Sequence, residues 1–178
     1  FADSSHRVEL AATAIGPRVP SMPQAYHTSI VVDGVEYCFC RAGVVGNRNC
    51  LSHQNFRGVP SVNFMGMTSF PAATMLKALR PFFREGTYDL LRKNCNTFSD
   101  CALFLLLGRR LEGKYKVVEQ IGDVADKSLG LVRMITMGDY MPNPKAENFD
   151  LAQVLESITK FSDAQQPSSP QTQLKLEN

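Results

Sequence analysis

Alternating apolar and polar residues predict β-strands in the first part of the chain. The stretch "HRVELAATAI" (6–15) reads as a strand that is polar at its start and apolar afterwards. Two runs rich in β-branched and aromatic residues, "AYHTSIVV" and "VEYCFC", flank the dipeptide Asp33-Gly34. Because Asp-Gly suits a two-residue type I′ turn, we predict a β-hairpin over 25–40.

The middle of the chain is less regular. Three prolines within 16–25 deny backbone donors to a sheet, which predicts a loop. Residues 41–70 are rich in Gly, Asn and Ser and predict short irregular pieces, with a candidate strand over 61–67. The apolar spacing that follows predicts a helix over 71–86, which Pro81 should end or kink.

Helical spacing dominates the second half. Asn94 stands where a helix N-cap belongs, and Gly108 stands where that helix should end. Because 94–108 is apolar nearly all round, we expect this helix to be buried. Residues 114–137 also predict a helix. A further, amphipathic helix is predicted from an apolar stripe made of Phe149, Leu151, Val154, Leu155, Ile158 and Phe161.

These elements predict one folded α+β domain with short appendages. We expect a terminal tail over 1–5, the domain over 6–140, a linker over 141–148, the amphipathic helix over 149–162 and a disordered tail over 163–178. The helix over 149–162 is expected to pack on its own domain or on a second copy in a homodimer. The alternative is that it docks a partner.

Charge and cysteine content narrow the function classes. A formal net charge of +2 over 178 residues is far from the dense basic field of a nucleic-acid binder. The chain has no apolar run long enough to cross a membrane and no signal-peptide pattern at its start. Five cysteines without regular spacing indicate reduced thiols, and therefore a cytoplasmic or nuclear location.

Cys95 is the first candidate for chemistry. It follows the predicted N-cap Asn94, so it lies in the first turn of the buried helix. Unpaired backbone N–H groups and the helix dipole favour a thiolate there and can bind a developing oxyanion. Asn94 and Asn96 could order this site. Cys101, six residues on, should pack in the core.

A nucleophilic thiol needs a base, and three histidines are available. His6 lies near the terminus and His53 lies in a polar loop. His27 lies on the first hairpin strand, where alternation puts it on one face and Tyr26 and Thr28 on the other. A histidine near the open end of a strand can stand at the rim of a sheet, so His27 is the preferred base.

Two rival constellations remain open. Cys38, Cys40, Cys50 and His53 have zinc-ligand chemistry, but their C-x-C-x9-C-x2-H spacing lacks the paired knuckles of zinc folds. Alternatively, Cys40 is the nucleophile, because the predicted hairpin register sets it directly opposite His27. Cys40 lacks a helix dipole, so we prefer Cys95. We expect Cys40 near the reactive centre, where mild oxidation could link it reversibly to Cys95.

Two blocks of the chain resemble the PPPDE family of permuted papain-like peptidases, which includes desumoylating isopeptidases. One block is "YHTSIVVDGVEYCF" and the other is "TYDLLRKNCNTFSD". The resemblance covers about 6–112 and implies a permuted papain-like fold, in which a small antiparallel sheet or barrel packs against helices that include the catalytic one. It also implies a catalytic dyad of His27 and Cys95, and the family is associated with removing SUMO or ubiquitin from lysine.

Three features depart from the family pattern. Cys40 and Arg41 stand where glycines are expected, so the groove could be narrower or differently charged. Tyr26 replaces the Trp that often precedes the histidine. The Pro-and-Trp segment after the catalytic helix is missing. These departures leave the dyad intact and leave the substrate open.

The expected function is therefore acyl transfer without a metal or cofactor. A thiol protease would cleave a ubiquitin-like modifier from its protein conjugates, acting as a desumoylating or deubiquitinating enzyme. The alternatives are an acyl-protein thioesterase (depalmitoylase) with the same dyad, and an inactive binding module of this fold. No Asp or Asn can be assigned as the residue that orients His27.

Overall fold

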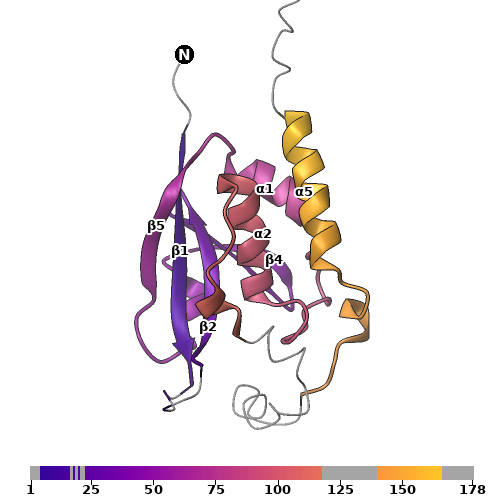
Figure 1. Cartoon of the computed structure of the whole chain (residues 1–178). Helices are drawn as coiled ribbons and strands as arrows, with labels where there is room; N and C mark the ends of the chain where they lie inside the picture. The colour runs from indigo at the N-terminus through magenta and orange to yellow at the C-terminus, as the bar shows by residue number, and fades with distance from the viewer. Residues whose placement is uncertain (1–4, 17, 19, 21–22, 118–139, 166–178) are drawn as a thin grey trace, which may run out of the picture.

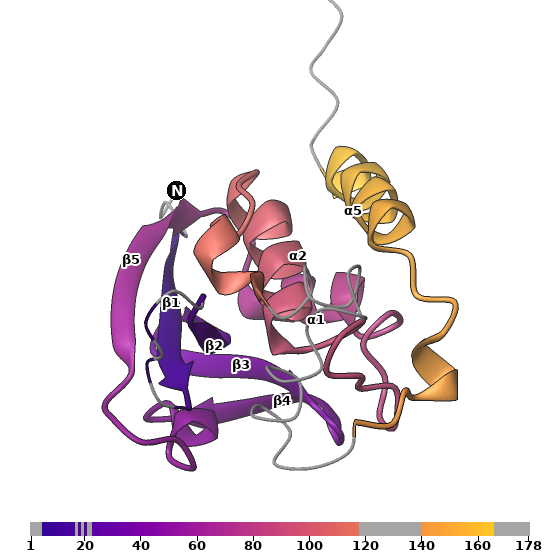
Figure 2. The same ribbon diagram turned by 60° about the horizontal axis from the view of Figure 1, so that its bottom comes forward.

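The computed structural model describes residues 5–16, 18, 20, 23–117 and 140–165. Five antiparallel strands form one sheet in the order β4-β3-β2-β1-β5. The strands are β1 (His6–Ile15), β2 (Ala25–Val32), β3 (Val35–Cys40), β4 (Gly43–Arg48) and β5 (Ser61–Thr68). Figures 1 and 2 show the sheet curving around the helices, so the predicted α+β class with a small antiparallel sheet is confirmed.

The hairpin of β2 and β3 has the predicted turn. Asp33 and Gly34 have φ values of 50° and 79°, and type I′ requires positive φ at both positions. The Asp33 carboxylate also accepts the backbone N–H of Arg7 at 2.8 Å, which fastens the turn to β1. Paired residues run from Val32–Val35 to Ile30–Tyr37, which is the predicted register. The ladder ends there, before it reaches His27 and Cys40.

Strand β4 corrects the sequence prediction, which treated its residues as irregular. It pairs with β3 from Cys40–Gly43 to Val35–Arg48 and forms an edge of the sheet. Its Gly and Asn content argues against a strand locally, but pairing with β3 overrides that preference. Gly43 is needed at its start, because φ is +86° and an added Cβ would lie 3.0 Å from the Glu85 backbone nitrogen.

The described residues contain three α-helices, α1 (Ala72–Leu79), α2 (Cys95–Leu107) and α5 (Leu151–Gln165). Helix α1 ends two residues before Pro81, which confirms the predicted break. Helix α2 begins after Asn94 and ends at Gly108, whose φ of 63° is the left-handed conformation of a helix C-cap. Both predicted boundaries of α2 are therefore confirmed.

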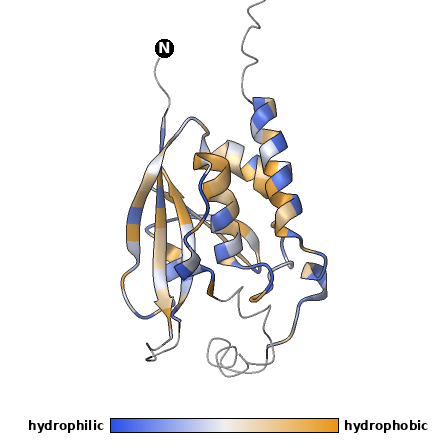
Figure 3. Cartoon of the chain, viewed as in Figure 1, coloured by the Kyte–Doolittle hydropathy of each residue, from blue (hydrophilic) through white to orange (hydrophobic). Residues whose placement is uncertain are grey.

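Helix α2 is the centre of the core. Figure 2 shows it on the concave side of the sheet, with α5 farther out. Its residues Phe98, Cys101 and Ala102 are fully buried with Ile30 of β2 and Val8 of β1. Figure 3 shows α2 as hydrophobic over most of its length. The predictions that this helix is buried and that Cys101 packs in the core are both confirmed.

The C-terminal part packs on its own domain. Val154 and Ile158 of α5 are buried, and α5 contacts α2 and α1. Before α5, the segment expected as a linker contains a short 3₁₀ turn (Pro144–Ala146).

Most of the helix predicted over 114–137 lies outside the described residues. A 3₁₀ turn (Gly113–Tyr115) covers the start of that range. In the portion of the chain that is described, no helix has the length and apolarity needed to cross a membrane.

Candidate active site

Cys95 is the first residue of α2 and is 6% exposed. The Asn94 side chain accepts the backbone N–H groups of Asn96 at 2.8 Å and Thr97 at 3.0 Å. In return the Thr97 hydroxyl accepts the Asn94 N–H at 3.3 Å, which completes a capping box. The cap fixes the thiol at the end of α2 where the helix dipole is positive.

Asn96 fastens this end of α2 to β2. Its amide nitrogen donates to the carbonyl of Tyr26 at 3.1 Å, and its amide oxygen accepts the hydroxyl of Thr28 at 2.8 Å. These two partners flank His27 in sequence. The same amide oxygen lies 3.7 Å from the Cys95 sulfur. One buried side chain therefore joins the Cys95 turn to the backbone that carries His27.

His27 lies on the opposite face of β2 from Thr28, as predicted. Its Nε2 is 2.7 Å from the Ser52 hydroxyl, and its ring stacks on Phe56 with centroids 5.0 Å apart. The centroid of the His53 ring lies 4.6 Å away. Burial, and secondarily the neighbouring His53, lower the pKa of His27 to about 3. The imidazole is consequently neutral near physiological pH.

The other two histidines have structural partners. His53, expected in a polar loop, is 1% exposed, and its ring nitrogens bond with the hydroxyls of Thr13 at 2.8 Å and Ser29 at 2.9 Å. Burial lowers the pKa of His53, and the nearby charge of Glu36 partly offsets this shift. His6 pairs with Asp33 at 2.6 Å on the surface. Of the three histidines, His27 lines a cleft.

That cleft has a volume of about 380 Å³ and opens where β2 and β3 separate. It is lined by His27, Cys38, Phe39, Cys40, Arg41, Val45, Asn47, Leu51, Ser52, Asn55, Phe56 and Tyr88. Burial raises the pKa of Tyr88 well above its ordinary value, and the charge and hydrogen bond of Cys95 raise it further. Tyr88 therefore keeps its phenolic proton and connects the His27 cleft to the Cys95 thiol.

Two further thiols, Cys38 and Cys40, line the same cleft. Cys40 is half-buried and lines the cleft with His27, but the β-ladder does not extend to this pair. Burial raises the pKa of Cys38 to about 12; a hydrogen bond with Ser52 acts to lower it, and the charges of Glu36, Cys40 and Cys95 add to the rise. Cys38 is therefore a thiol, not a thiolate, near neutral pH.

The rival zinc constellation does not assemble. Both ring nitrogens of His53 are engaged by the hydroxyls of Thr13 and Ser29. Nowhere in the described ranges do three or more His, Cys, Asp or Glu side chains gather in a way that could hold a metal ion. Among the described residues, the rival zinc site of Cys38, Cys40, Cys50 and His53 is therefore not formed.

Sequence reasoning missed Glu36, Ser52 and Tyr88 in this region. The hairpin register offered one signal, because Glu36 pairs with Val31 and so shares a face with His27 and Ser29. Ser52 carries no such signal, since a 3₁₀ turn in the loop after β4 brings it under His27.

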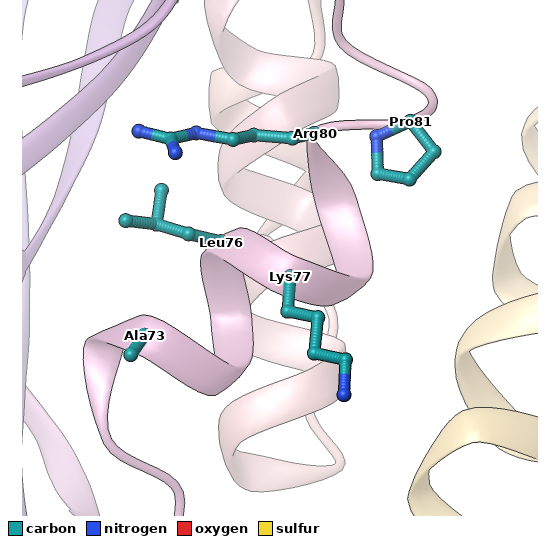
Figure 4. Close-up of a pocket in the computed structure, with 5 residues that line it drawn as sticks. All are labelled: Ala73, Leu76, Lys77, Arg80 and Pro81. Atoms are coloured by element: carbon teal, nitrogen blue, oxygen red, sulfur yellow. The ribbon is translucent and has the colours of Figure 1, made fainter.

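A second hollow lies along α1 and has different chemistry. It has a volume of about 510 Å³ and is lined by Ala73, Leu76, Lys77, Arg80 and Pro81. Figure 4 shows Leu76 and Arg80 extending one way and Lys77 another, so the two cationic groups do not converge. No Cys, Ser, His or carboxylate side chain is among its lining residues, so this hollow does not hold a thiol or hydroxyl nucleophile paired with a base.

Known proteins share sequence similarity with this chain. Residues 3–135 match the family model described as "PPPDE putative peptidase domain". The chain is also similar to desumoylating isopeptidase 1 of Xenopus laevis, with 32% identity over 91 residues. That alignment covers 48% of this chain and 52% of the relative, so the chain spans about half of the relative's length. Since the family match extends over well more than half of its residues, the chain belongs to the PPPDE peptidase family.

Proposed function

We propose that the protein is a cysteine isopeptidase that removes a ubiquitin-like modifier, SUMO or ubiquitin, from lysine side chains. Cys95 is the nucleophile and His27 is the base in this proposal. The observation that carries it is the Asn96 bridge, which bonds to Tyr26 and Thr28 on both sides of His27 while its oxygen lies 3.7 Å from the Cys95 sulfur. Membership of a peptidase family supports the same reaction class.

The reaction begins with proton transfer from Cys95 to neutral His27. The thiolate attacks the isopeptide carbonyl, and the Cys95 backbone N–H, at the start of α2, stabilises the oxyanion. The Asn94 side chain already takes the N–H groups of Asn96 and Thr97, so these two are not assigned to the oxyanion. His27 then protonates the leaving lysine amine and activates the water that hydrolyses the thioester.

His27 is neutral, but a pKa of about 3 makes it a weak base for a thiol unless its imidazolium is stabilised as it forms. A general base must be unprotonated before it accepts a proton, and burial holds the pKa of His27 at about 3. When the proton arrives from Cys95, the thiolate next to the imidazolium compensates the new charge. The proton therefore moves only as the nucleophile forms.

The modifier class comes from the related isopeptidase and from the cleft lining. The relative is named for desumoylation. In this chain Arg41, Asn47 and Asn55 offer hydrogen-bonding groups along the cleft, which suits the backbone of an extended modifier C-terminus. Val45, Leu51 and Phe56 line the same cleft and would suit a fatty chain, so an acyl-protein thioesterase is the second candidate.

A cleavage assay on three substrates tests the proposal. Isopeptide-linked SUMO, isopeptide-linked ubiquitin and an acyl-thioester reporter are incubated with wild type, Cys95→Ala, His27→Ala and the core control Cys101→Ala. We expect one modifier conjugate to be cleaved by wild type and Cys101→Ala, and by neither dyad variant. Cleavage of the thioester alone would assign the second candidate. Cleavage that persists in Cys95→Ala would reject the dyad.

A further inference from the structure

A chain of three polar side chains runs from the cleft, which His27 and Ser52 line, to the buried Glu36 on the same face of the sheet. The Ser52 hydroxyl donates to the Glu36 carboxylate at 2.5 Å and lies 2.7 Å from His27 Nε2. The Ser52 backbone N–H donates to the other oxygen of the same carboxylate at 3.2 Å. Glu36 is 1% exposed and His27 is 9% exposed, so this chain is largely shielded from water.

Counting protons fixes the direction of every bond in this chain. A serine hydroxyl carries one proton, and here that proton goes to Glu36. Toward His27 the Ser52 oxygen can therefore only accept. The bond at 2.7 Å then requires that His27 Nε2 carries the ring proton. In neutral His27 the other nitrogen, Nδ1, must hold the free lone pair.

We propose that Ser52 and Glu36 are positioning residues that hold His27 in the tautomer whose Nδ1 accepts the proton of Cys95. This inference rests on the proposed function. When Nδ1 takes that proton, the ring becomes an imidazolium, and the Glu36 carboxylate, one hydroxyl away, stabilises the positive charge. Ser52 and Glu36 supply the orienting partner that sequence reasoning could not assign among Asp and Asn residues.

An unusual backbone conformation precedes the turn that places Ser52 next to His27. Asn49 and Cys50 have positive φ values of 59° and 49°, directly before the 3₁₀ turn that carries Ser52. Residues other than glycine adopt this left-handed conformation infrequently, so the surrounding contacts must hold the turn in place. Phe56 and His53 pack against the His27 ring. Together with Ser52 they fix both the plane and the rotation of the imidazole.

The Glu36→Gln variant is the sharpest probe, because it reverses the chain without changing its shape. The Ser52 N–H needs an acceptor, so the glutamine oxygen should face it and the amide nitrogen should donate to the Ser52 oxygen. The Ser52 proton is then released toward His27 Nε2, which becomes an acceptor. His27 is thereby converted to the tautomer protonated at Nδ1, which cannot accept the Cys95 proton.

Nitrogen NMR of ring-labelled protein near neutral pH reads the tautomer without reference to activity. We expect Nε2–H in wild type, Nδ1–H in Glu36→Gln and a mixture in Ser52→Ala. Ser52→Thr, which keeps the hydroxyl, should restore Nε2–H. The matched control is Ser29→Ala, which removes a buried hydroxyl that bonds His53 and not His27. That control should leave the His27 tautomer unchanged.

Kinetics on the cleaved conjugate provide the second readout. We expect kcat to fall on the order of 10²-fold in Glu36→Gln and Ser52→Ala with KM little changed, and to recover in Ser52→Thr.

Two tautomer results would overturn the inference: a proton on Nδ1 of His27 in wild type, or a His27 tautomer that is the same in wild type, Glu36→Gln and Ser52→Ala. If wild type cleaves no substrate but shows the expected tautomers, the proposed function fails while the hydrogen-bond assignment stands. If kcat is unchanged in Glu36→Gln despite a reversed tautomer, the positioning role is rejected.

Discussion

Two imidazole rings are buried side by side at the site, and the protein keeps both neutral. Burial is the main cause of the lowered pKa of His27 and of His53. The charge of Glu36 raises the pKa of His53 and so opposes the effect of burial. One Glu36 carboxylate oxygen lies 3.5 Å from Nε2 of His53. Because an unfolded chain protonates histidine near pH 6.5, burying neutral histidine makes folding depend on pH.

The sign of this dependence gives the first prediction. Below pH 6.5 the unfolded chain binds a proton at position 27, whereas the folded protein binds it only near pH 3. The free energy of unfolding should therefore fall between pH 7 and pH 5, by up to about 2 kcal/mol from His27 alone. Urea unfolding at several pH values measures it. Stopping at pH 5 keeps the low-pKa carboxylates Asp89 and Asp100 ionised.

His27→Gln supplies the control for this prediction. The variant removes one of the two buried histidines that titrate, so its stability should depend less steeply on pH in the same interval. An unchanged slope would show that protonation of His27 does not destabilise the fold.

At the scale of elements, the contact between α2 and β2 decides whether the site exists. Local signals predict each element by itself, since Asn94 and Gly108 bound α2 and Asp33-Gly34 forms the hairpin turn. Their relative placement depends on Asn96, whose partners lie about seventy residues away in sequence. Pairings of this range leave no periodic pattern, so the sequence could not predict them without the family resemblance.

Replacing Asn96 tests this coupling. Asn96→Ala leaves the Tyr26 carbonyl without its amide donor and Thr28 with Ser99 as its remaining acceptor at 3.0 Å. Unfolding free energy should fall by about 1–3 kcal/mol, and the activity per folded molecule should fall with it. Thr28→Val probes the same bridge: it removes the Thr28 bonds to Asn96 and Ser99 but keeps the Asn96 bond to the Tyr26 carbonyl, so activity per folded molecule should fall less than in Asn96→Ala. Equal activity in wild type and Asn96→Ala would mean that the bridge does not align the site.

At the scale of the whole molecule, the C-terminal segment completes the core around α2. Asp89 accepts hydrogen bonds from the Tyr140 hydroxyl at 2.7 Å and from the Asn143 N–H at 2.8 Å. These bonds anchor the segment that leads into α5, which then buries Val154 and Ile158 against the domain. The apolar stripe predicted from the sequence is thus used within the chain, which disfavours a partner-docking role for it.

A cavity substitution in α5 measures how much this packing contributes. Ile158→Ala should lower the unfolding free energy by about 2–5 kcal/mol, because Ile158 is 2% exposed within the core. Gln153→Ala, at an exposed position of the same helix, should change it by less than about 0.5 kcal/mol. Equal effects of the two substitutions would indicate that α5 does not stabilise the domain.

More of the architecture than of the candidate site could be predicted from the sequence. Strong local patterns predicted the hairpin, the buried helix and the places of Cys95 and His27 within them. Strand β4 and the Ser52 turn depend on tertiary pairing, and their Gly- and Asn-rich sequence conceals them. The buried carboxylate of Glu36 looked like an ordinary polar position of a strand. Only the folded loop shows that it faces Ser52.

The most direct measurement of the central claim is the mass of the adduct formed with an electrophilic probe. Wild type, Cys95→Ala, His27→Ala and Cys101→Ala are treated with SUMO and ubiquitin bearing a C-terminal vinyl sulfone, and the modified peptide is mapped by mass spectrometry. We predict a single covalent adduct on Cys95, retained in Cys101→Ala, slowed in His27→Ala and absent from Cys95→Ala. An adduct on Cys40, or labelling of Cys95 no faster than that of an ordinary free thiol, would contradict the account.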